Sequence, residues 1–455
     1  MKNWLQSLDK NILALLRTIG QKAEQKNFAA FVVGGYVRDV ILKRKNFDLD
    51  IVVEADAVPL AQEFSREFGG SLIVYKQFMT ATVVLPDGLL TFAQPRKNIP
   101  ESKGRDTDYH NLVKQKSVRV DFVTARKEFY PHPGALPVVR AGSIHDDLFR
   151  RDFTINAMAV SIYPRTFGQL RDDFGGYQDL QDKKIRILHP QSFRDDPTRI
   201  LRAVRFEQRS HFRIEKHSLS MLKLALKNDA VSLVKPPRYF DEFKKILSEE
   251  HPQKFLRRLW KLGALGFLEL KSKNFSQTLK LMHRIEGQII WFEEKIPRAK
   301  AIERWLPFFM VLADGLSADR LRHLFKKFHF KKEDQLTLLS CVKIPSLLKS
   351  LRSQRIKPSE VFAQLKSLSY ETILFSKAKA RHRTTIKHIE DFLLTYDSKK
   401  LTINGRDLNR LGIPPGKQMG IILNNILCAK IDGELKTQEE ELSKAEELFD
   451  RRRQL

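Results

Sequence analysis

The sequence is poor in cysteine and in long apolar runs. Its 455 residues include only Cys341 and Cys428, too few and too far apart for a disulfide framework or a cysteine-based zinc site. The longest uncharged apolar stretches, such as residues 306–313, are well short of the roughly 20 residues that a membrane-spanning helix needs. Residues 1–24 are charged throughout and lack the apolar core of a signal peptide. We therefore expect a cytoplasmic protein with no membrane partner.

Acidic residues are scarce relative to basic ones. Lysine and arginine number 81 against 54 aspartates and glutamates, which gives a formal net charge of +27. Such an excess attracts polyanions, of which RNA and DNA are the commonest. Basic side chains also recur along residues 377–387, where they form either an ordinary solvated helix face or a contact with nucleic acid. The composition thus favours nucleic-acid binding.

The two parts of the chain differ in the spacing of their apolar residues. From about Asp195 onward apolar residues recur at helical spacing and strand signals disappear. The polar stretch 86–116 interrupts the first part, and we take it as an insertion on the rim of a sheet. The predicted fold class is α+β: an N-terminal mixed-sheet head followed by an elongated, all-helical neck, body and tail. Strands are predicted at residues 28–33, 47–53, 71–75, 79–85 and 118–124.

A glycine pair followed by two aspartates is the most informative pattern. Gly34 and Gly35 follow an apolar strand and permit a tight turn into a helix predicted at residues 36–43. Asp48 and Asp50 interrupt the next strand, where residues two apart project from the same face. Two such carboxylates repel each other without a cation, and paired divalent metals are the usual solution in phosphoryl displacement. Each motif alone is readily a surface turn or a chance pairing, whereas their strand–turn–helix–strand order predicts a metal-dependent nucleotidyl-transfer site.

Two later segments carry further residue types that such a site needs. Asp121 is an acid embedded in an apolar strand, and it is either a third carboxylate beside the metal pair or a loop cap. Arg151, one of a tandem arginine pair, can neutralise a phosphate. Asp152 and Asn156, four residues apart, are expected to share a helical face, where they suit a ribose diol. The alternative is a helix N-terminus that Asp152 and Thr154 cap.

A charged helix is predicted to begin near Asp195. Acids occupy its first turn, and a proline stands where a helix start tolerates one. Asp196, Arg199 and Arg202 recur every three residues and so lie along one side. An acid and an arginine held together offer an acceptor and a fork of donors, which can read the edge of a base. Without a wider context such a face is usually only solvated.

These motifs together resemble the class II tRNA nucleotidyltransferase and bacterial poly(A) polymerase family. They occur in the order of that family: Gly34-Gly35-x-x-Arg38-Asp39, Asp48-x-Asp50, Arg150-Arg151-Asp152-Phe153-Thr154-x-Asn156-Ala157, Asp173 to Leu180, and Asp195-Asp196-Pro197-Thr198-Arg199. The resemblance is closest to bacterial CCA-adding enzymes, because residues 48–55, the loop at 130–137 and the segments 401–408 and 411–416 are similar to theirs. It spans most of the chain and is weak over residues 272–398.

The resemblance implies a role for each group of residues. Asp48 and Asp50 would hold Mg²⁺ in a two-metal site, with Asp121 as a third catalytic carboxylate. Asp196 and Arg199 would serve as the template for the incoming base. The remaining nucleotide-binding residues would be Gly34, Gly35, Arg38, Arg151, Asp152, Asn156, Arg202 and Arg205.

The chain departs from the family pattern in three places. Asp195 stands where the family usually has Glu, so its side chain is one methylene shorter. Pro237-Arg238 replaces a Glu-Arg pair, and we expect Arg238 and Glu242 to support the template residues instead. The stretch 86–116 is longer than the family leads one to expect.

The activity that the resemblance implies is template-independent addition of C, C and A to the 3′ acceptor end of tRNA. CTP and ATP would be the substrates, pyrophosphate would leave, and DNA would have no part. The alternatives are an A-adding enzyme, a poly(A) polymerase and a non-catalytic RNA-binding protein. The loop at 130–137 speaks against CC-only addition, and the isolated His145-Asp146 pair speaks against phosphohydrolase activity. The implied domains are a catalytic head at 1–162, a neck with the base-recognition helix at 163–270, an RNA-binding body at 271–398 and a tRNA-binding tail at 399–455.

Overall fold

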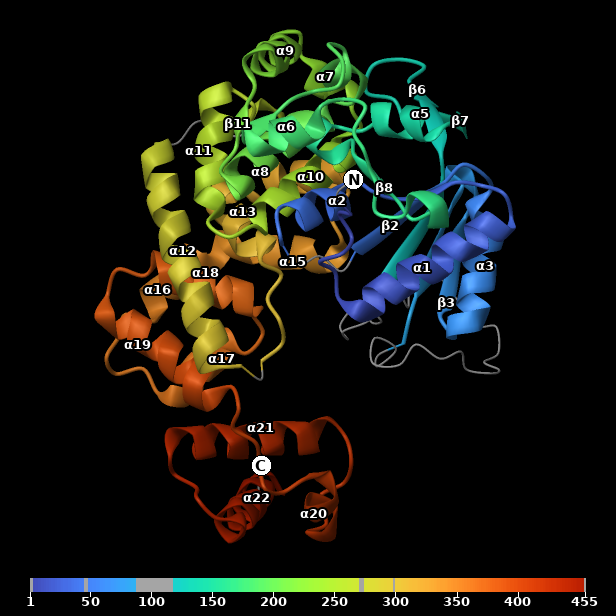
Figure 1. Ribbon diagram of the computed structural model, residues 1–455. Coiled ribbons are helices and arrows are strands. Elements are labelled where there is room, and N and C mark those ends of the chain that lie inside the picture. Colours follow the sequence, from blue (N-terminus) through green and yellow to red (C-terminus); the bar gives the residue numbers. More distant parts are fainter. Residues whose placement is uncertain (1–2, 45–47, 87–117, 270–273, 298, 454–455) are drawn as a thin grey trace. The chain divides into compact units, whose positions relative to one another are not determined.

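The computed structural model describes residues 3–44, 48–86, 118–269, 274–297 and 299–453 (Figure 1). Two units divide the chain, Met1–Tyr239 and Phe240–Leu455. Across the described ranges no helix is long and apolar enough to cross a membrane. Nearly all of the predicted insertion at 86–116 lies outside the described residues, and the predicted division of the chain into four domains stays a prediction.

The first unit is built around a mixed sheet. Its described strands are β1 (Ala30–Val33), β2 (Asp48–Val53), β3 (Ser71–Tyr75), β4 (Thr80–Val84), β5 (Arg119–Thr124), β8 (Ala159–Ser161) and β9 (Leu170–Arg171). They lie in the order β3-β4-β5-β2-β1-β8-β9, so β2 is an interior strand, antiparallel to β1 and parallel to β5. The strands predicted from the sequence are confirmed, with boundaries that differ by at most two residues.

One face of the sheet is covered by a helix, and the other carries the predicted acids beside a second apolar cluster that includes Val33 and Val52. Helix α3 (Ala57–Phe68) packs on β3, β4 and β5, as Figure 1 shows. On that face the ring of Phe122 in β5 is fully buried, 5.3 Å between centroids from Phe64 of α3. Side chains alternate along a strand, so Asp50 and Asp121 project from the opposite face. The apolar core thus fixes the strands that carry the acids.

Shorter elements complete the first unit. Strands β6 (Arg126–Phe129) and β7 (Val138–Ala141) form a hairpin, and β10 (Lys184–Ile185) pairs in parallel with β11 (Arg213–Ile214). The prediction that strands end before Asp195 is therefore wrong at β11, which is too short to show an alternating pattern. The helices are α1 (Lys10–Gln25), α2 (Gly35–Ile41), α5 (Ile144–Phe149), α6 (Gly176–Gln181), α7 (Ser192–Asp195), α8 (Thr198–Ser210) and α9 (Lys216–Lys227).

The second unit is helical in its described residues. Helix α10 (Pro236–Leu247) leads into it, and its Phe240 stacks on Phe328 with ring centroids 4.6 Å apart. Near the C-terminus, Glu441 is fully buried and accepts a backbone hydrogen bond from Ile403 at 3.1 Å. The remaining helices are α11 (Pro252–Leu262), α12 (Phe275–Lys295), α13 (Trp305–Ala313), α14 (Ala318–Phe328), α15 (Lys332–Ser340), α16 (Ile344–Ser350), α17 (Pro358–Leu365), α18 (Tyr370–Lys379), α19 (Arg383–Asp391), α20 (Gly405–Arg410), α21 (Lys417–Asp432) and α22 (Gln438–Arg453).

Candidate active site

Two neighbouring strands bring the predicted carboxylates together. β2 and β5 pair with Asp50 opposite Asp121 and Asp48 opposite Arg119, so the three acids share one face of the sheet. Asp121 already accepts hydrogen bonds from Arg119 on both oxygens, at 2.9 and 3.0 Å, and from the hydroxyl of Thr82. Within the described ranges no three His, Cys, Asp or Glu side chains converge as a ready metal cage. Asp121 is therefore already engaged by neighbouring side chains of the protein.

The charge of Asp50 is poorly compensated. The pKa of Asp50 is raised to about 6, chiefly by burial and also by the carboxylates of Asp121 and Asp48, while Arg151 and Arg119 oppose the shift. A raised pKa means that a negative charge at this position costs free energy in the absence of a cation. The available donors are carboxylate oxygens, which Mg²⁺ and Mn²⁺ prefer. The donor set of Asp48 and Asp50 thus fits a hard divalent cation.

A glycine is required where the chain turns from β1 into α2. Gly34 has a φ of +69°, and a side chain there would place its Cβ 2.3 Å from Nη1 of Arg151. Gly35 begins α2, which ends two residues earlier than predicted. From α2, Arg38 donates to Oδ1 of Asn156 at 2.7 Å. The turn therefore lies against two side chains that are distant in the sequence.

The helix predicted over the Arg-Arg-Asp segment is wrong. Asp152 precedes a short 3₁₀ turn, Thr154–Asn156, and Phe153 between them forms a β-bridge with Ile187. Asp152 and Asn156 nevertheless meet, because Nδ2 of Asn156 donates to Oδ1 of Asp152 at 2.8 Å. The predicted pair is thus brought together by tertiary structure and not by helical spacing.

A buried acid that the sequence did not reveal anchors both tandem arginines. Asp147 of α5 is fully buried and accepts hydrogen bonds from Arg150 at 2.7 Å and from Arg151 at 2.9 Å. Burial alone would raise the pKa of Asp147, but the two arginines hold it below its usual value. The signal that could have found Asp147 is its spacing, because Arg150 and Arg151 stand three and four residues after it. Its neighbour Asp146 caps α5.

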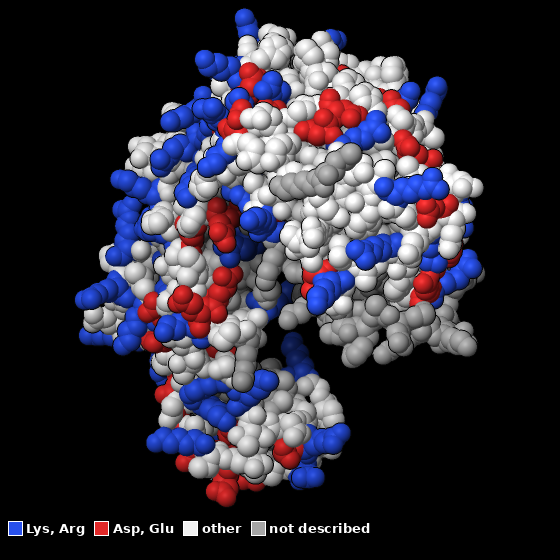
Figure 2. All heavy atoms as spheres, viewed as in Figure 1, with Lys and Arg blue, Asp and Glu red and all other residues white. Residues whose placement is uncertain are grey.

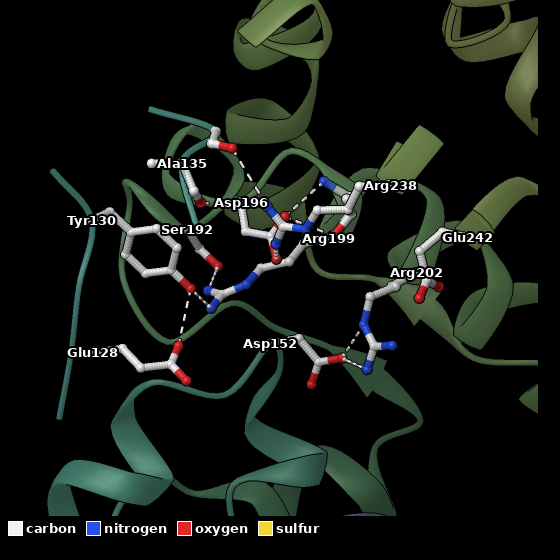
Figure 3. A network of polar contacts seen from close by, with 12 residues as sticks. Glu128, Tyr130, Ala135, Asp152, Ser192, Asp196, Arg199, Arg202, Arg238 and Glu242 are labelled. Atoms are coloured by element: carbon white, nitrogen blue, oxygen red, sulfur yellow. Dashed lines mark hydrogen bonds and ion pairs between the residues drawn. The ribbon is translucent and has the colours of Figure 1, made fainter. Parts of the chain in front are cut away.

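Arg199 is held by the β6–β7 hairpin and by α7 (Figure 3). It is buried, and it donates to Oγ of Ser192 at 2.6 Å and to the carbonyl oxygen of Arg150 at 2.8 Å. Arg199 also lies 3.4 Å from the hydroxyl of Tyr130, which donates to Glu128 at 3.1 Å. Glu128 was missed by the sequence reasoning, because its link to Arg199 runs through Tyr130 and depends on the folded hairpin.

Asp196 lies just before α8 and not within the helix that the sequence predicts. Its Oδ1 accepts hydrogen bonds from the backbone and the hydroxyl of Thr198, at 3.1 and 2.7 Å, and its Oδ2 pairs with Arg238 at 2.7 Å. Arg238 also reaches the carbonyl oxygens of Gly134 and Ala135, each at 3.4 Å. The contact expected between Arg238 and Asp196 is therefore present (Figure 3).

Most of the predicted residues line a cavity of about 530 Å³. Of the described residues, eight arginines and four carboxylates form its wall, so it suits an anion. Arg202 donates to the buried carboxylate of Asp152 at 2.6 and 2.9 Å, and Arg205 lies over the ring of Phe206. Gly34, Asp48 and Asp121 are not part of the wall. The predicted residues that line the cavity are Gly35, Arg38, Asp50, Arg151, Asp152, Asn156, Asp196, Arg199, Arg202 and Arg205.

Comparison with known proteins gives matches along most of the chain. Family models match residues 30–186 (Poly A polymerase head domain), 211–273 (Probable RNA and SrmB-binding site of polymerase A) and 299–445 (tRNA nucleotidyltransferase domain 2 putative). A solved structure described as CCA-adding enzyme apo form II is 33% identical, with a TM-score of 0.73 and 97% of both chains covered. The chain belongs to the tRNA nucleotidyltransferase and poly(A) polymerase family.

Family members with different printed activities are similar to this chain. An A-adding tRNA nucleotidyltransferase of Geobacter sulfurreducens is 32% identical over 97% of the chain, which spans 48% of that relative's length. The A-adding enzyme of Halalkalibacterium halodurans is 29% identical, with 99% of this chain and 95% of the relative covered. The Thermotoga maritima CCA-adding enzyme complexed with tRNA is 32% identical, with a TM-score of 0.69 and 97% and 96% covered. The family is thus established, whereas these likenesses do not separate A addition from CCA addition.

Asp195 and Glu242, which belong to the departures from the family pattern, make contacts within the first unit and within α10, respectively. The carboxylate of Asp195 lies 3.9 Å from Nδ1 of His189, and its carbonyl oxygen accepts a hydrogen bond from the backbone of Gly134 at 3.1 Å. Asp195 therefore links α7 to the loop of the β6–β7 hairpin through its backbone. Glu242 forms an ion pair with Lys245 on its own helix at 2.6 Å.

Proposed function

We propose that this family member transfers nucleotidyl groups from CTP and ATP to the 3′ end of tRNA, adding C, C and A and releasing pyrophosphate. The observation that carries the proposal is that Asp50 lines the same arginine-rich cavity as Asp196 and Arg199. A cation ligand, an anion site and groups that can read a base edge therefore lie in one place.

The protein's contribution to the reaction is binding and alignment. When held by Asp48 and Asp50, with Asp121 beside them, Mg²⁺ supplies the charge that activates an RNA hydroxyl and stabilises departing pyrophosphate. No side chain needs to act as a nucleophile, so the reaction depends on how closely the two substrates are aligned. In this proposal the ribose and the phosphates are bound by Gly34, Gly35, Arg38, Arg151, Asp152, Asn156, Arg202 and Arg205.

The acid–arginine pair accounts for the choice of nucleotide. Cytosine and adenine both carry an exocyclic amino group, whereas uracil and guanine carry an oxygen at the corresponding position. The carboxylate of Asp196 can accept a hydrogen bond from an amino group but offers no donor to an oxygen. Arg199 supplies the complementary donors to a ring nitrogen. The pair therefore favours CTP and ATP over UTP and GTP.

A-only addition is the second candidate, because the Geobacter and Halalkalibacterium relatives are both A-adding enzymes. The two functions make different products from the same RNA. We expect tRNA transcripts that end at the discriminator base, at C and at CC all to be completed to CCA when labelled CTP and ATP are supplied. An A-adding enzyme would extend only the transcript that ends in CC, and a poly(A) polymerase would give a long adenosine tract, as gel sizing shows.

Arg238 is expected to keep Asp196 in position for base reading. Arg238→Gln removes the charged partner of Oδ2, and a hydrogen bond to a charged group contributes about 1.5–3 kcal/mol. We therefore expect kcat/KM for CTP and ATP to fall about tenfold or more. The loss for UTP and GTP should be smaller, so the ratio of kcat/KM between correct and wrong nucleotides should decrease.

The matched control for Arg238 is Lys235→Gln, an exposed charge just before the same helix. Steady-state incorporation with each of the four nucleotides separates the two variants. Equal discrimination in Arg238→Gln and in the unaltered protein would show that Arg238 has no part in base selection.

A further inference from the structure

A pair of stacked aromatic rings, one exposed and one partly buried, lies on α11 and α12 in the second unit. The rings of Trp260 and Phe275 have centroids 5.0 Å apart and planes inclined by 11°. Trp260 is 53% exposed, although tryptophan is usually largely buried. The pair therefore holds a large flat ring at the surface and restricts its orientation.

Basic side chains accompany this pair. On α11 the exposed Lys254, Arg257 and Lys261 surround Trp260 in sequence, and α12, which packs against α11, adds the exposed Lys280 and Arg284. α11 contains no acidic residue. Figure 2 shows lysine and arginine side chains gathered along the left-hand edge, where Figure 1 places these two helices. The flat ring thus lies in a region of positive charge.

Three cations of α11 face solvent without an acidic partner among the described residues. The structure gives Lys254, Arg257 and Lys261 no side-chain ion pair within the described ranges. Glu286, the acid of α12 nearest to Arg284 in sequence, is buried and accepts hydrogen bonds from Gln253 and from the backbone of His251, each at 3.0 Å. The field of the region therefore remains positive toward solvent.

The basic run at 377–387 differs in this respect. Its Lys377 is buried, pairs with Glu390 at 2.8 Å and lies 3.1 Å from the centroid of the Trp291 ring. That lysine is committed to internal contacts. Arg381, Arg383 and Lys387 of that run are exposed, whereas the cations of α11 stand beside a tryptophan that is exposed as well.

We propose that Trp260, Phe275 and the three cations of α11, together the α11–α12 platform, bind RNA by stacking an unpaired or helix-terminal base on Trp260. Every base has a π-face, so stacking tolerates any sequence, while lysine and arginine bind the adjoining phosphates. The choice of tRNA as that RNA rests on the proposed function. The platform is an RNA-binding surface in addition to the cavity where nucleotides bind.

Trp260→Ala is expected to weaken the binding of a tRNA transcript about tenfold, because stacking on an aromatic ring makes a contribution of that order per base. Trp260→Phe should restore most of the affinity. Replacement of Lys254, Arg257 and Lys261 by Gln should lower the slope of log Kd against log salt by about two to three. Fluorescence anisotropy of labelled tRNA measures each effect, and tRNA should also protect Trp260 from iodide quenching.

The matched control is Leu336→Ala, which truncates an apolar side chain of α15 that is 62% exposed. It should leave tRNA affinity unchanged. Wild-type affinity in folded Trp260→Ala, or an unaltered salt slope in the three-Gln variant, would overturn the platform. Nucleotide incorporation is measured separately: an unaltered protein that binds tRNA but adds no nucleotide would refute the proposed function and leave the platform standing.

Discussion

Asp50→Asn is expected to abolish nucleotide incorporation while stabilising the metal-free protein. The amide cannot supply the charge that a catalytic cation requires, and the stabilisation that a cation gives to developing charge is worth several kcal/mol. Incorporation should therefore fall about a thousandfold or more. Affinity for tRNA should stay near that of the unaltered protein, because a basic surface and not one acid provides it. Labelled CTP incorporation and tRNA binding measure the two properties.

The stabilising effect of the same change depends on pH. The pKa of Asp50 is raised to about 6 in the folded protein, so ionisation costs stability progressively from about pH 4 and fully above about pH 6. Asp50→Asn should raise the free energy of unfolding by about 2–3 kcal/mol at pH 8 in EDTA, and by less as the pH falls toward 4.

A matched change at the neighbouring acid checks the cause of this stabilisation. Asp48→Asn should lose activity without the gain in stability, because Asp48 is exposed. Added Mg²⁺ should raise the melting temperature of the unaltered protein and not that of Asp50→Asn. Sustained incorporation by Asp50→Asn would remove the basis of the site assignment.

Asp147→Asn is expected to produce the largest loss of stability. The change leaves Arg150 and Arg151 without the buried charge that they share, and breaking a buried ion pair from one side costs about 3–5 kcal/mol. Because the pKa of Asp147 is lowered in the folded protein, its stabilising contribution is present above about pH 4 and is lost as the pH falls further. Urea unfolding at pH 7.5 should therefore separate the variant from the unaltered protein, and the separation should shrink in acid.

Asp146→Asn provides the control for Asp147. Asp146 is partly exposed in the same helix and caps it by accepting hydrogen bonds from Ser143, so its loss should cost about 1 kcal/mol. Asp147→Asn should also reduce incorporation, since Arg151 lines the cavity and is oriented by Asp147. A cost below 1 kcal/mol for Asp147→Asn would mean that the two arginines find other partners.

The strand acids were predictable because strand periodicity is local. Asp48 and Asp50 stand in an apolar, β-branched segment, so alternation alone places both on one face. The position of Asp121 opposite Asp50 depends on strand pairing, yet any parallel register that buries the apolar residues of both strands keeps the acids on the same side. These features needed no information from distant parts of the chain.

The arginine segment was only partly predictable because tertiary contacts override its local pattern. Phe153 bridges to Ile187, a pairing between segments that helical periodicity cannot reveal, and the predicted helix does not form. The ion pairs of Asp147 with Arg150 and Arg151 follow local spacing, but the burial of Asp147 does not show in that spacing. Glu128 became recognisable only when the hairpin placed Tyr130 beside Arg199. Local spacing thus identified which residues matter but not all of the partners that hold them.

Asp196 and Arg199 make hydrogen bonds to the protein before any substrate arrives. A base that binds to Asp196 and Arg199 breaks some of these hydrogen bonds. It must replace them with hydrogen bonds of its own, since a buried charged group left without a partner is costly. A mismatched base therefore incurs a penalty as well as lacking a benefit. If the two residues read the base as proposed, these existing contacts make the free-energy penalty for UTP and GTP larger than the binding free energy gained with CTP or ATP.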